Sequence, residues 1–191
     1  MFYSSVDSNA RNGVGIIVDR HLKEEVMSVE RRNDRIMSLR LNVGETETTL
    51  LSVYAPQIMG RDEAEKDELW SAMDEVMMAV PKEDGVLVGG DLNGHVGGNN
   101  DEEERVFGRQ SFGRRNEGGQ RIVDHAVAFD LAIMDTFFRK REEQLITYRS
   151  GGRRSQIDYL LWRRYHLEEI KDVKVINGDN VSAQHKLLVM D

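Results

Sequence analysis

The stretch from Val86 to Gly98, VLVGGDLNGHVGG, decides how the middle of this chain folds. Its first half is short and apolar and is bounded by glycine, which is typical of a buried strand. Its second half is a glycine-rich turn that carries Asp91, Asn93 and His95. Loops at the ends of strands often hold functional groups, because the strands below them form a rigid scaffold. The stretch therefore predicts a strand that delivers polar side chains to one end of a sheet.

Strands dominate the rest of the chain. The segment 35–43, RIMSLRLNV, alternates apolar and polar residues with the period of two that indicates a half-buried strand. Similar strand-like runs cover residues 13–19, 25–30, 48–55, 85–90, 131–136, 144–150, 156–163, 172–177 and 186–191. Strands in such number predict more than one sheet.

Two segments have helical spacing instead. Residues 62–80 place Leu69, Met73 and Met77 on one face and end before Pro81. A second helix is expected to begin after Asn116, a good N-cap, and to end before Asp130. The order is hairpins, then strand–helix units, then further strands. It predicts an α+β fold, a two-sheet β-sandwich flanked by helices, in which residues 1–191 form a single domain.

Composition limits the class of protein. The chain has 191 residues, 39% of them hydrophobic and 31% charged, as expected for a soluble globular domain. It contains no cysteine, which excludes disulfides and thiolate metal sites. We find no signal peptide, no run long enough to span a membrane and no sign of a membrane partner. We therefore expect an intracellular protein, nuclear or cytoplasmic, and its oligomeric state stays open.

Charge is unevenly distributed. The formal net charge is -8, which argues against a protein that binds nucleic acid by bulk charge alone. Residues 139–164, however, carry eight arginines and lysines against three acidic residues. This basic region could face a phosphate backbone, or it could be a solvated hairpin rich in arginine.

The pair Asp91 and Asn93 suggests one kind of chemistry. If the chain stays extended there, both side chains project to the same side and could work on one ligand. The aspartate could accept a proton from water or hold a hydrated cation, and the asparagine could orient a phosphate oxygen. The alternative is an ordinary Asp-x-Asn-Gly turn whose side chains bond their own backbone.

Two later residues fit the same chemistry. Asp158 interrupts a strongly apolar strand, so its carboxylate needs a partner. His185 directly precedes the last predicted strand, where a loop could point it at that carboxylate. Each has a simpler explanation: Asp158 could cap a turn or pair with an arginine, and His185 could be a surface residue.

Four ordered segments carry a family resemblance: SVYAPQ, GGDLNGHVG, SQIDYLLWRR and SAQHKLLVMD. In this order and spacing the chain resembles the endonuclease/exonuclease/phosphatase superfamily of metal-dependent phosphodiesterases. It is more closely similar to the endonuclease domains of non-LTR (LINE-type) retrotransposons and to the craniofacial-development-protein-2-like sequences derived from them. ITYRSGGRRSQIDYLL and AQHKLLVMD carry the closer match.

The resemblance implies a Mg²⁺ or Mn²⁺ ion, DNA as the partner and no organic cofactor. It implies that Asp91 aligns or deprotonates water, that Asn93 holds this water or the phosphate, and that Tyr54 contacts the phosphate or the leaving group. Asp158 would orient His185, which would stabilise the pentavalent phosphorus. The expected residues are, for catalysis, Asp91, Asn93, His185, Asp158 and Tyr54; for substrate binding, Gln57, Arg114, Arg115, Arg153 and Arg154; and for the metal, Asp91 and Asp158. His95 has no assigned role.

The sequence also departs from the family pattern. Members start with a strand bearing Asn and a later strand bearing the main metal-ligand Glu, and this chain looks as if it begins after both. Gln184 stands where the family has an acidic residue before the histidine. We therefore expect a domain lacking its first strands, a weakly held metal and impaired catalysis. The alternatives are a phosphatase of small phosphoesters and a non-enzymatic remnant that binds nucleic acid or protein.

Overall fold

The computed structural model describes residues 1–3, 12–44, 46–57, 63–98, 105–180 and 182–191. It consists of two compact units, Met1–Gly90 and Asp91–Asp191. Each unit is described by itself, and the expectation of a single domain over 1–191 stays a prediction. Strands and helices occur in both units, which confirms the mixed class expected from the sequence.

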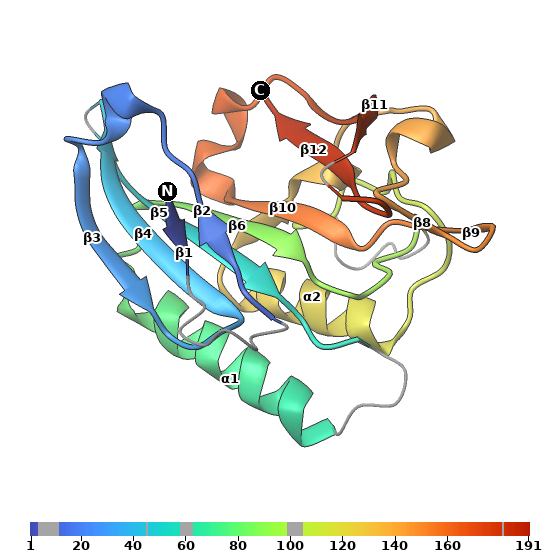
Figure 1. Ribbon diagram of the computed structural model, residues 1–191, viewed down its shortest axis with the longest axis horizontal. Helices are drawn as coiled ribbons and strands as arrows, with labels where there is room; N and C mark the ends of the chain where they lie inside the picture. The colour runs from blue at the N-terminus through green and yellow to red at the C-terminus, as the bar shows by residue number, and fades with distance from the viewer. Residues whose placement is uncertain (4–11, 45, 58–62, 99–104, 181) are drawn as a thin grey trace. The chain divides into compact units, whose positions relative to one another are not determined.

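The first unit is built on four neighbouring strands in the order β3-β4-β5-β6. Their bounds are Val26–Arg31, Ile36–Val43, Thr46–Tyr54 and Gly85–Asp91, and the last residue of β6 begins the second unit. β3 and β5 both pair antiparallel with β4. The first unit also contains a two-stranded ribbon, in which β1 (Phe2–Tyr3) pairs with β2 (Gly15–Ile16), and a 3₁₀ turn, η1 (Arg20–Leu22). This unit holds the hairpin half of the fold (Figure 1).

The strand β4 differs in one respect from the predicted alternation. Ile36, Met37, Ser38 and Leu39 are all buried, so both faces of the strand are covered at its start. Toward its end Val43, expected inside, is half exposed. The hydrophobic period located the strand correctly, but it cannot report a second layer that covers the polar face.

The helix α1, Glu63–Ala79, lies along this unit (Figure 1). It buries the predicted apolar face, including Leu69, Met73 and Met77. Arg35, at the start of β4, donates a hydrogen bond to the Glu65 carboxylate at 2.8 Å. This partly buried ion pair joins the helix to the sheet at its first turn.

The end of β6 approaches β5 so closely that only glycine fits. Gly90 has φ +149°, and a Cβ there would lie 1.8 Å from the carbonyl oxygen of Val53. A side chain would therefore collide with the backbone of the neighbouring strand. The second glycine of the GG pair in the motif is therefore required where the end of β6 approaches β5.

The second unit contains the remaining elements. They are α2 (Glu117–Ala128), β7 (Leu131–Ile133), η2 (Met134–Thr136), η3 (Glu142–Gln144), β8 (Tyr148–Ser150), β9 (Arg153–Ser155), β10 (Asp158–Arg163), η4 (Arg164–Glu169), β11 (Val173–Asn180) and β12 (Lys186–Met190). Three antiparallel pairs organise them: β7 with β10, β8 with β9, and β11 with β12 (Figure 1).

Two of these pairs pack on each other. Ala132 and Met134, in and after β7, form a buried cluster with Val173 of β11. Partly buried side chains from β10 and β12 pack against this cluster, including Trp162 and Leu188. Apolar side chains from two separate strand pairs thus share one core, as two packed sheets do.

Three predicted strands are shorter than expected. Residues 13–19 form a strand only at Gly15–Ile16. Of residues 131–136, only Leu131–Ile133 is extended, because the chain then tightens into η2. Residues 144–150 form a strand only at Tyr148–Ser150, because the chain first completes η3 and turns at Leu145. Short apolar runs do not distinguish a strand from a 3₁₀ turn.

Within the described ranges, the structure has no helix that is both long and apolar enough to cross a membrane.

Candidate phosphodiesterase site

Asp91 occupies the end of β6, where the chain turns away from the strand. The next residue, Leu92, is buried and donates its backbone N–H to the Ile157 carbonyl at 2.9 Å. This bond holds the segment after β6 beside the start of β10. It therefore brings Asp91 toward Asp158, the first residue of β10.

The backbone does not stay extended through Asn93. Asn93 has φ +47°, a left-handed conformation, and its N–H donates to Asp91 Oδ1 at 3.0 Å. The condition of an extended chain, on which the prediction from strand period depended, is therefore not met, although the Asn93 side chain still hydrogen-bonds to the Asp91 carboxylate. The segment is the Asp-x-Asn turn that was the alternative, in which the carboxylate bonds its own backbone. Such a turn still fixes the direction of the Asp91 carboxylate.

The loop after this turn is held by the start of α2. Asn116, the predicted N-cap, accepts hydrogen bonds from the N–H groups of Gly119 at 2.8 Å and His95 at 2.9 Å. A Cβ at Gly119 would lie 1.7 Å from the His95 carbonyl oxygen, so loop and helix are in direct backbone contact. His95 itself is half buried, and burial lowers the pKa of its imidazole. The loop is thus a fixed part of the site wall.

Asp158 is oriented through a threonine that sequence reasoning missed. Thr147 is fully buried, and its Oγ1 accepts the N–H groups of Ile157 and Asp158, each at 3.1 Å. One hydroxyl thus fixes the backbone on which Asp158 stands. A threonine in a strand-like run gives no sequence signal of such a role, because threonine is common in strands.

His185 lies between the two carboxylates. Its Nδ1 is 3.1 Å and 3.2 Å from the two carboxylate oxygens of Asp158. Its Nε2 is 3.8 Å from Asp91 Oδ2. A carboxylate at Nδ1 fixes the tautomer of the ring and favours the protonated form.

The electrostatics of the three groups are linked. Burial, together with the charge of Asp158, raises the pKa of Asp91 to about 7. The hydrogen bond that His185 donates to Asp158 raises the pKa of the imidazole above its ordinary value, against the opposing effect of burial. Two close carboxylates repel each other, so a proton or a cation between them is favoured. The cluster therefore attracts positive charge at neutral pH.

The same three side chains form a possible cation site. One ligand atom from each of Asp91, Asp158 and His185 lies within 4.8 Å of the others, the one such group of three among the described residues. The two carboxylates are oxygen ligands of the kind that Mg²⁺ and Mn²⁺ prefer, whereas an imidazole can bind a metal only in its neutral form. Burial contributes most to the raised pKa of Asp91, and repulsion from Asp158 adds to it; a divalent ion would relieve that repulsion. These donors therefore fit the implied metal.

A buried polar layer stabilises this region of the unit. The Tyr159 hydroxyl donates to the Gln156 carbonyl at 2.8 Å and accepts the N–H of Val96 at 3.3 Å. The side chain of Gln156 accepts from Ser111 Oγ and from the N–H of Phe112. These bonds attach the 111–112 segment to the residues just before β10, so the chain that leads to Arg114 is held in place.

The four predicted arginines have different environments. Arg115 donates through Nε to the Val96 carbonyl at 2.7 Å, and its guanidinium lies 5.5 Å from the centroid of the Phe107 ring. Arg114 is exposed. Arg153 and Arg154, on β9, are exposed too, and Arg154 pairs with Glu142 at 2.8 Å. Arg114 and the two arginines of β9 can thus reach solvent, whereas Arg115 is engaged with the protein.

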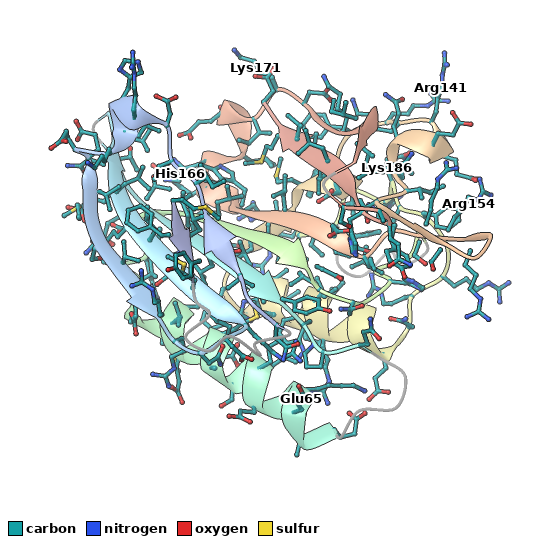
Figure 2. The ribbon with its side chains drawn as sticks, viewed as in Figure 1. Glu65, Arg141, Arg154, His166, Lys171 and Lys186 are labelled. Atoms are coloured by element: carbon teal, nitrogen blue, oxygen red, sulfur yellow. The ribbon has the colours of Figure 1, made fainter. Side chains whose placement is uncertain are left out.

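Further basic groups surround the β8–β9 hairpin. Figure 2 shows Arg141, Arg154 and Lys186 on the side of the second unit formed by β8, β9 and β12. Arg149 of β8 is exposed. Burial first, and then the charge of Arg149, lower the pKa of Lys186. The hairpin thus carries a local positive field on an acidic chain.

Tyr54 and Gln57 belong to the first unit, so their predicted contact with the phosphate stays a prediction. Tyr54 is half buried at the end of β5, and Gln57 is exposed. The Arg35 guanidinium lies 5.2 Å from the centroid of the Tyr54 ring and also donates to the Tyr54 carbonyl. Arg35 is therefore a contact of Tyr54 that the sequence did not reveal.

Comparison with known proteins supports the fold. No protein-family model matches the chain. Craniofacial development protein 2 of Tragulus javanicus is 30% identical over 191 residues, which cover 99% of this chain and 33% of that protein, and the Bos taurus protein is 29% identical. The chain thus spans about a third of the length of these curated relatives.

Several solved structures are similar in fold to this chain. The endonuclease domain of TRAS1, a telomere-specific non-LTR retrotransposon, has a TM-score of 0.62 at 17% identity, covering 92% of this chain and 70% of that chain. An AP endonuclease from Archaeoglobus fulgidus has a TM-score of 0.63 at 13% identity, covering 87% and 71%. The chain therefore has the endonuclease/exonuclease/phosphatase fold, as its sequence resemblance predicted.

Proposed function

We propose that this chain hydrolyses phosphodiester bonds in DNA with the help of a divalent cation. The observation that carries the proposal is the approach of three groups from three separate parts of the chain. His185 contacts Asp158 through Nδ1, and its Nε2 is 3.8 Å from Asp91. A phosphodiester hydrolase needs an oriented cationic group and a carboxylate at one site, and this cluster supplies both.

His185 would stabilise the developing charge on the phosphoryl group. Its contact with Asp158 raises the pKa of the imidazole, which favours the protonated form, and Asp158 holds its orientation. A protonated ring can donate through Nε2 to a phosphate oxygen, and this bond strengthens as negative charge grows during the attack of water.

Asp91 would align the attacking water and take its proton. A group whose pKa lies near 7 is suited to a general base at neutral pH, because it is substantially ionised and still able to accept a proton. Water oxygen then bonds to phosphorus, one P–O bond breaks, and the leaving oxygen takes up a proton from solvent, so the products are a phosphomonoester and a free hydroxyl. Asn93 would hold this water or the phosphate, as its place in the same turn suggests.

Asp91 and Asp158 would hold the Mg²⁺ or Mn²⁺ ion. When bound, the ion would neutralise phosphate charge. Two carboxylates fill a small part of an octahedral shell, so water would complete it and the ion would be weakly held. We accordingly propose that activity needs a high concentration of free cation and is low compared with a site richer in carboxylates.

DNA is the proposed substrate because a long polyanion fits the basic hairpin. Arg149, Arg153 and Arg154 are exposed on β8 and β9, the hairpin that is bonded to the loop carrying His185. Each exposed cation can neutralise a backbone phosphate. Similarity to a retrotransposon endonuclease domain leads us to propose an endonuclease of that type, acting inside the cell. Arg114, Arg115, Tyr54 and Gln57 remain proposed substrate contacts.

The test is an assay with two substrates. The protein is incubated with supercoiled plasmid and, separately, with a small phosphomonoester, at several Mg²⁺ and Mn²⁺ concentrations and with a chelator. We expect cation-dependent conversion to open-circle plasmid and no release of phosphate from the small ester. A nicking activity that the chelator leaves unchanged would overturn the cation requirement.

The other two hypotheses give different results in the same assay. A phosphatase of small esters would release phosphate and leave the plasmid intact. A non-enzymatic remnant would retard the plasmid in a gel but nick it at no cation concentration. Either result would overturn the proposed endonuclease.

A further inference from the structure

Tyr148 lies directly across from His185. The two residues form an antiparallel β-bridge between β8 and the start of the last strand. Hydrogen bonds flank the bridge on both sides: the Arg149 N–H donates to the Gln184 carbonyl at 2.9 Å, and the Lys186 N–H donates to the Thr147 carbonyl at 2.8 Å. In this arrangement Tyr148 and His185 form the non-hydrogen-bonded kind of pair, in which opposed side chains come closest.

The two rings are in contact. Their centroids are 4.9 Å apart and their planes meet at 62°, an edge-to-face arrangement. Both side chains are half buried. The imidazole of His185 is therefore held by two groups: Asp158 fixes it at Nδ1, and the Tyr148 ring packs against it. An aromatic contact of this geometry favours one orientation of each ring over others.

A second set of contacts joins the histidine loop to the same hairpin. The Gln184 side chain donates to Ser150 Oγ at 2.7 Å. Ser182 Oγ accepts the His185 N–H at 3.2 Å, which closes the loop on itself. Gln184, the residue that replaces an acidic one in the family pattern, thus contacts the last residue of β8. The 184–186 segment thus lies beside β8 and is joined to it by one isolated β-bridge.

We propose that Tyr148 is a positioning residue for His185, and that through it the β8–β9 hairpin controls the orientation of the imidazole. The hairpin carries exposed arginines, so its engagement by a polyanion would act on the histidine through the contact between the two rings. This inference rests on the proposed function for its effect on catalysis. The orientation of the His185 ring does not depend on that function and can be measured separately.

The main rival is a direct role for the Tyr148 hydroxyl in binding the substrate. Two substitutions separate these roles. Tyr148→Phe keeps the ring and removes the hydroxyl, whereas Tyr148→Leu removes the ring. Tyr165→Leu is a matched control, because Tyr165 is exposed in η4 and also makes an edge contact with a histidine, His166, at 5.2 Å.

The deciding measurement is the nitrogen NMR spectrum of His185 in the protein without DNA. The Nδ1–H proton is protected from exchange while it is bonded to Asp158, and the nitrogen shifts report the tautomer and are little affected by ring currents. We expect the wild-type pattern in Tyr148→Phe and Tyr165→Leu. In Tyr148→Leu we expect the Nδ1–H signal to be lost to exchange and the nitrogen shifts to move toward those of a free imidazole.

The kinetic measurement uses the same variants on plasmid. We expect Tyr148→Leu to lower kcat by about tenfold, the scale of losing a group that orients a catalytic side chain, with little change in KM. Tyr148→Phe should keep the wild-type values. Loss of activity in Tyr148→Phe would overturn the inference, because it would assign the role to the hydroxyl.

The positioning role of Tyr148 and the proposed hydrolysis of DNA would be overturned by different results. An unchanged His185 spectrum in Tyr148→Leu overturns the positioning role, whatever the protein cleaves. A changed spectrum in a protein that nicks no DNA supports the positioning role and overturns the proposed hydrolysis instead.

Discussion

At the residue scale, the main feature of the site is the pairing of two carboxylates with one histidine. Asp158 and Asp91 are partly buried carboxylates close enough to raise the pKa of Asp91. Two such charges are costly without a compensating cation, and His185 lies where it can partner both. Thr147 fixes the backbone below Asp158, so the carboxylate meets the imidazole in one orientation.

Replacing Asp158 tests the pairing. Asp158→Asn keeps the size of the side chain but removes its charge, so His185 loses the partner that orients it and favours its protonation. We expect nicking to fall about 100-fold, the upper range for loss of an orienting carboxylate. Single-turnover nicking measures this effect. Glu168→Gln, at an exposed position of η4, is the control for loss of one negative charge and should nick as the wild type does. Equal rates for the two variants would contradict the role of Asp158.

A second prediction at the residue scale concerns Asp135 and the dependence of folding stability on pH. This carboxyl is fully buried below the site, and burial raises its pKa to about 7. Its Oδ2 accepts the Leu160 N–H, while Oδ1 has no partner among the described residues. The folded state therefore holds the proton more tightly than the unfolded chain does. Stability from this group is present at low pH and is lost as pH rises from about 4 to about 7.

Asp135→Asn removes that pH dependence and keeps the acceptor for Leu160. We expect the variant to gain stability relative to wild type between pH 5 and pH 8, by about 1–3 kcal/mol. Urea unfolding at the two pH values measures the difference. A constant difference between the two proteins across this range would show that Asp135 is ionised in the folded state.

The role of a single residue could be predicted from the sequence only where its type is unusual at that position. Asp91, Asp158 and His185 stood out because a carboxylate in an apolar strand and a histidine at a strand end are unusual. Thr147 and Tyr148 did not stand out, because both types are common in strands, and their roles arise from the strand that lies opposite.

At the scale of elements, α2 fixes the wall of the site through its first residues. Asn116 accepts from Gly119 inside the helix and from His95 in the loop after β6. One side chain thus begins the helix and fastens the loop that follows Asp91. The backbones of Gly119 and His95 are in direct contact, so the start of the helix and the loop hold each other in place.

Asn116→Ala removes both bonds. We expect it to lower the free energy of unfolding by about 1–2 kcal/mol, as loss of an N-cap does. Asn116→Asp retains an acceptor oxygen and should stay within a few tenths of a kcal/mol of wild type. Urea midpoints of the three proteins give the comparison. An alanine variant as stable as wild type would show that the cap contributes little.

Elements with a long repeating pattern were predictable, and short ones were not. The periodicity placed α1 and α2 within a residue or two of their observed ends. The runs 131–136 and 144–150 failed in part. The 3₁₀ turn η2 replaces the end of the first run, and the end of η3 with the turn that follows it takes the start of the second. Those turns depend on contacts from distant segments, such as the bond from Gly108 to Thr136.

At the scale of the whole molecule, charge is segregated. The chain carries a net charge of -8, yet β8 and β9 expose Arg149, Arg153 and Arg154. An acidic protein with one basic hairpin can bind a polyanion there while repelling it elsewhere. Binding to DNA should therefore depend on salt through these few cations.

Removing the two arginines of β9 tests this dependence. We expect Arg153→Gln with Arg154→Gln to weaken plasmid binding and to reduce the slope of log affinity against log salt by about 2, roughly one for each lost phosphate contact. Lys171→Gln is the control, because Figure 2 shows Lys171 and Arg154 well apart on the second unit. The titration is followed by fluorescence anisotropy. An equal change in slope for the control would show that net charge alone governs binding.

The fold of the molecule was predictable from the order of four short motifs, since their spacing matches a known arrangement of strands and loops. Similar solved structures confirm that fold. The covering of both faces of β4 was not predictable, because the period of a strand reports its own residues and not the layers packed on it.

The most direct test of the central claim is single-turnover nicking by Asp91→Asn in saturating Mg²⁺ or Mn²⁺. The claim is that Asp91, Asp158 and His185 act as one cation-dependent phosphodiesterase site. It predicts a loss of about 100-fold or more in rate with plasmid binding intact, because the variant keeps its shape but cannot accept the proton or hold the ion. An Asp91→Asn protein that nicks as fast as the wild type would contradict the account.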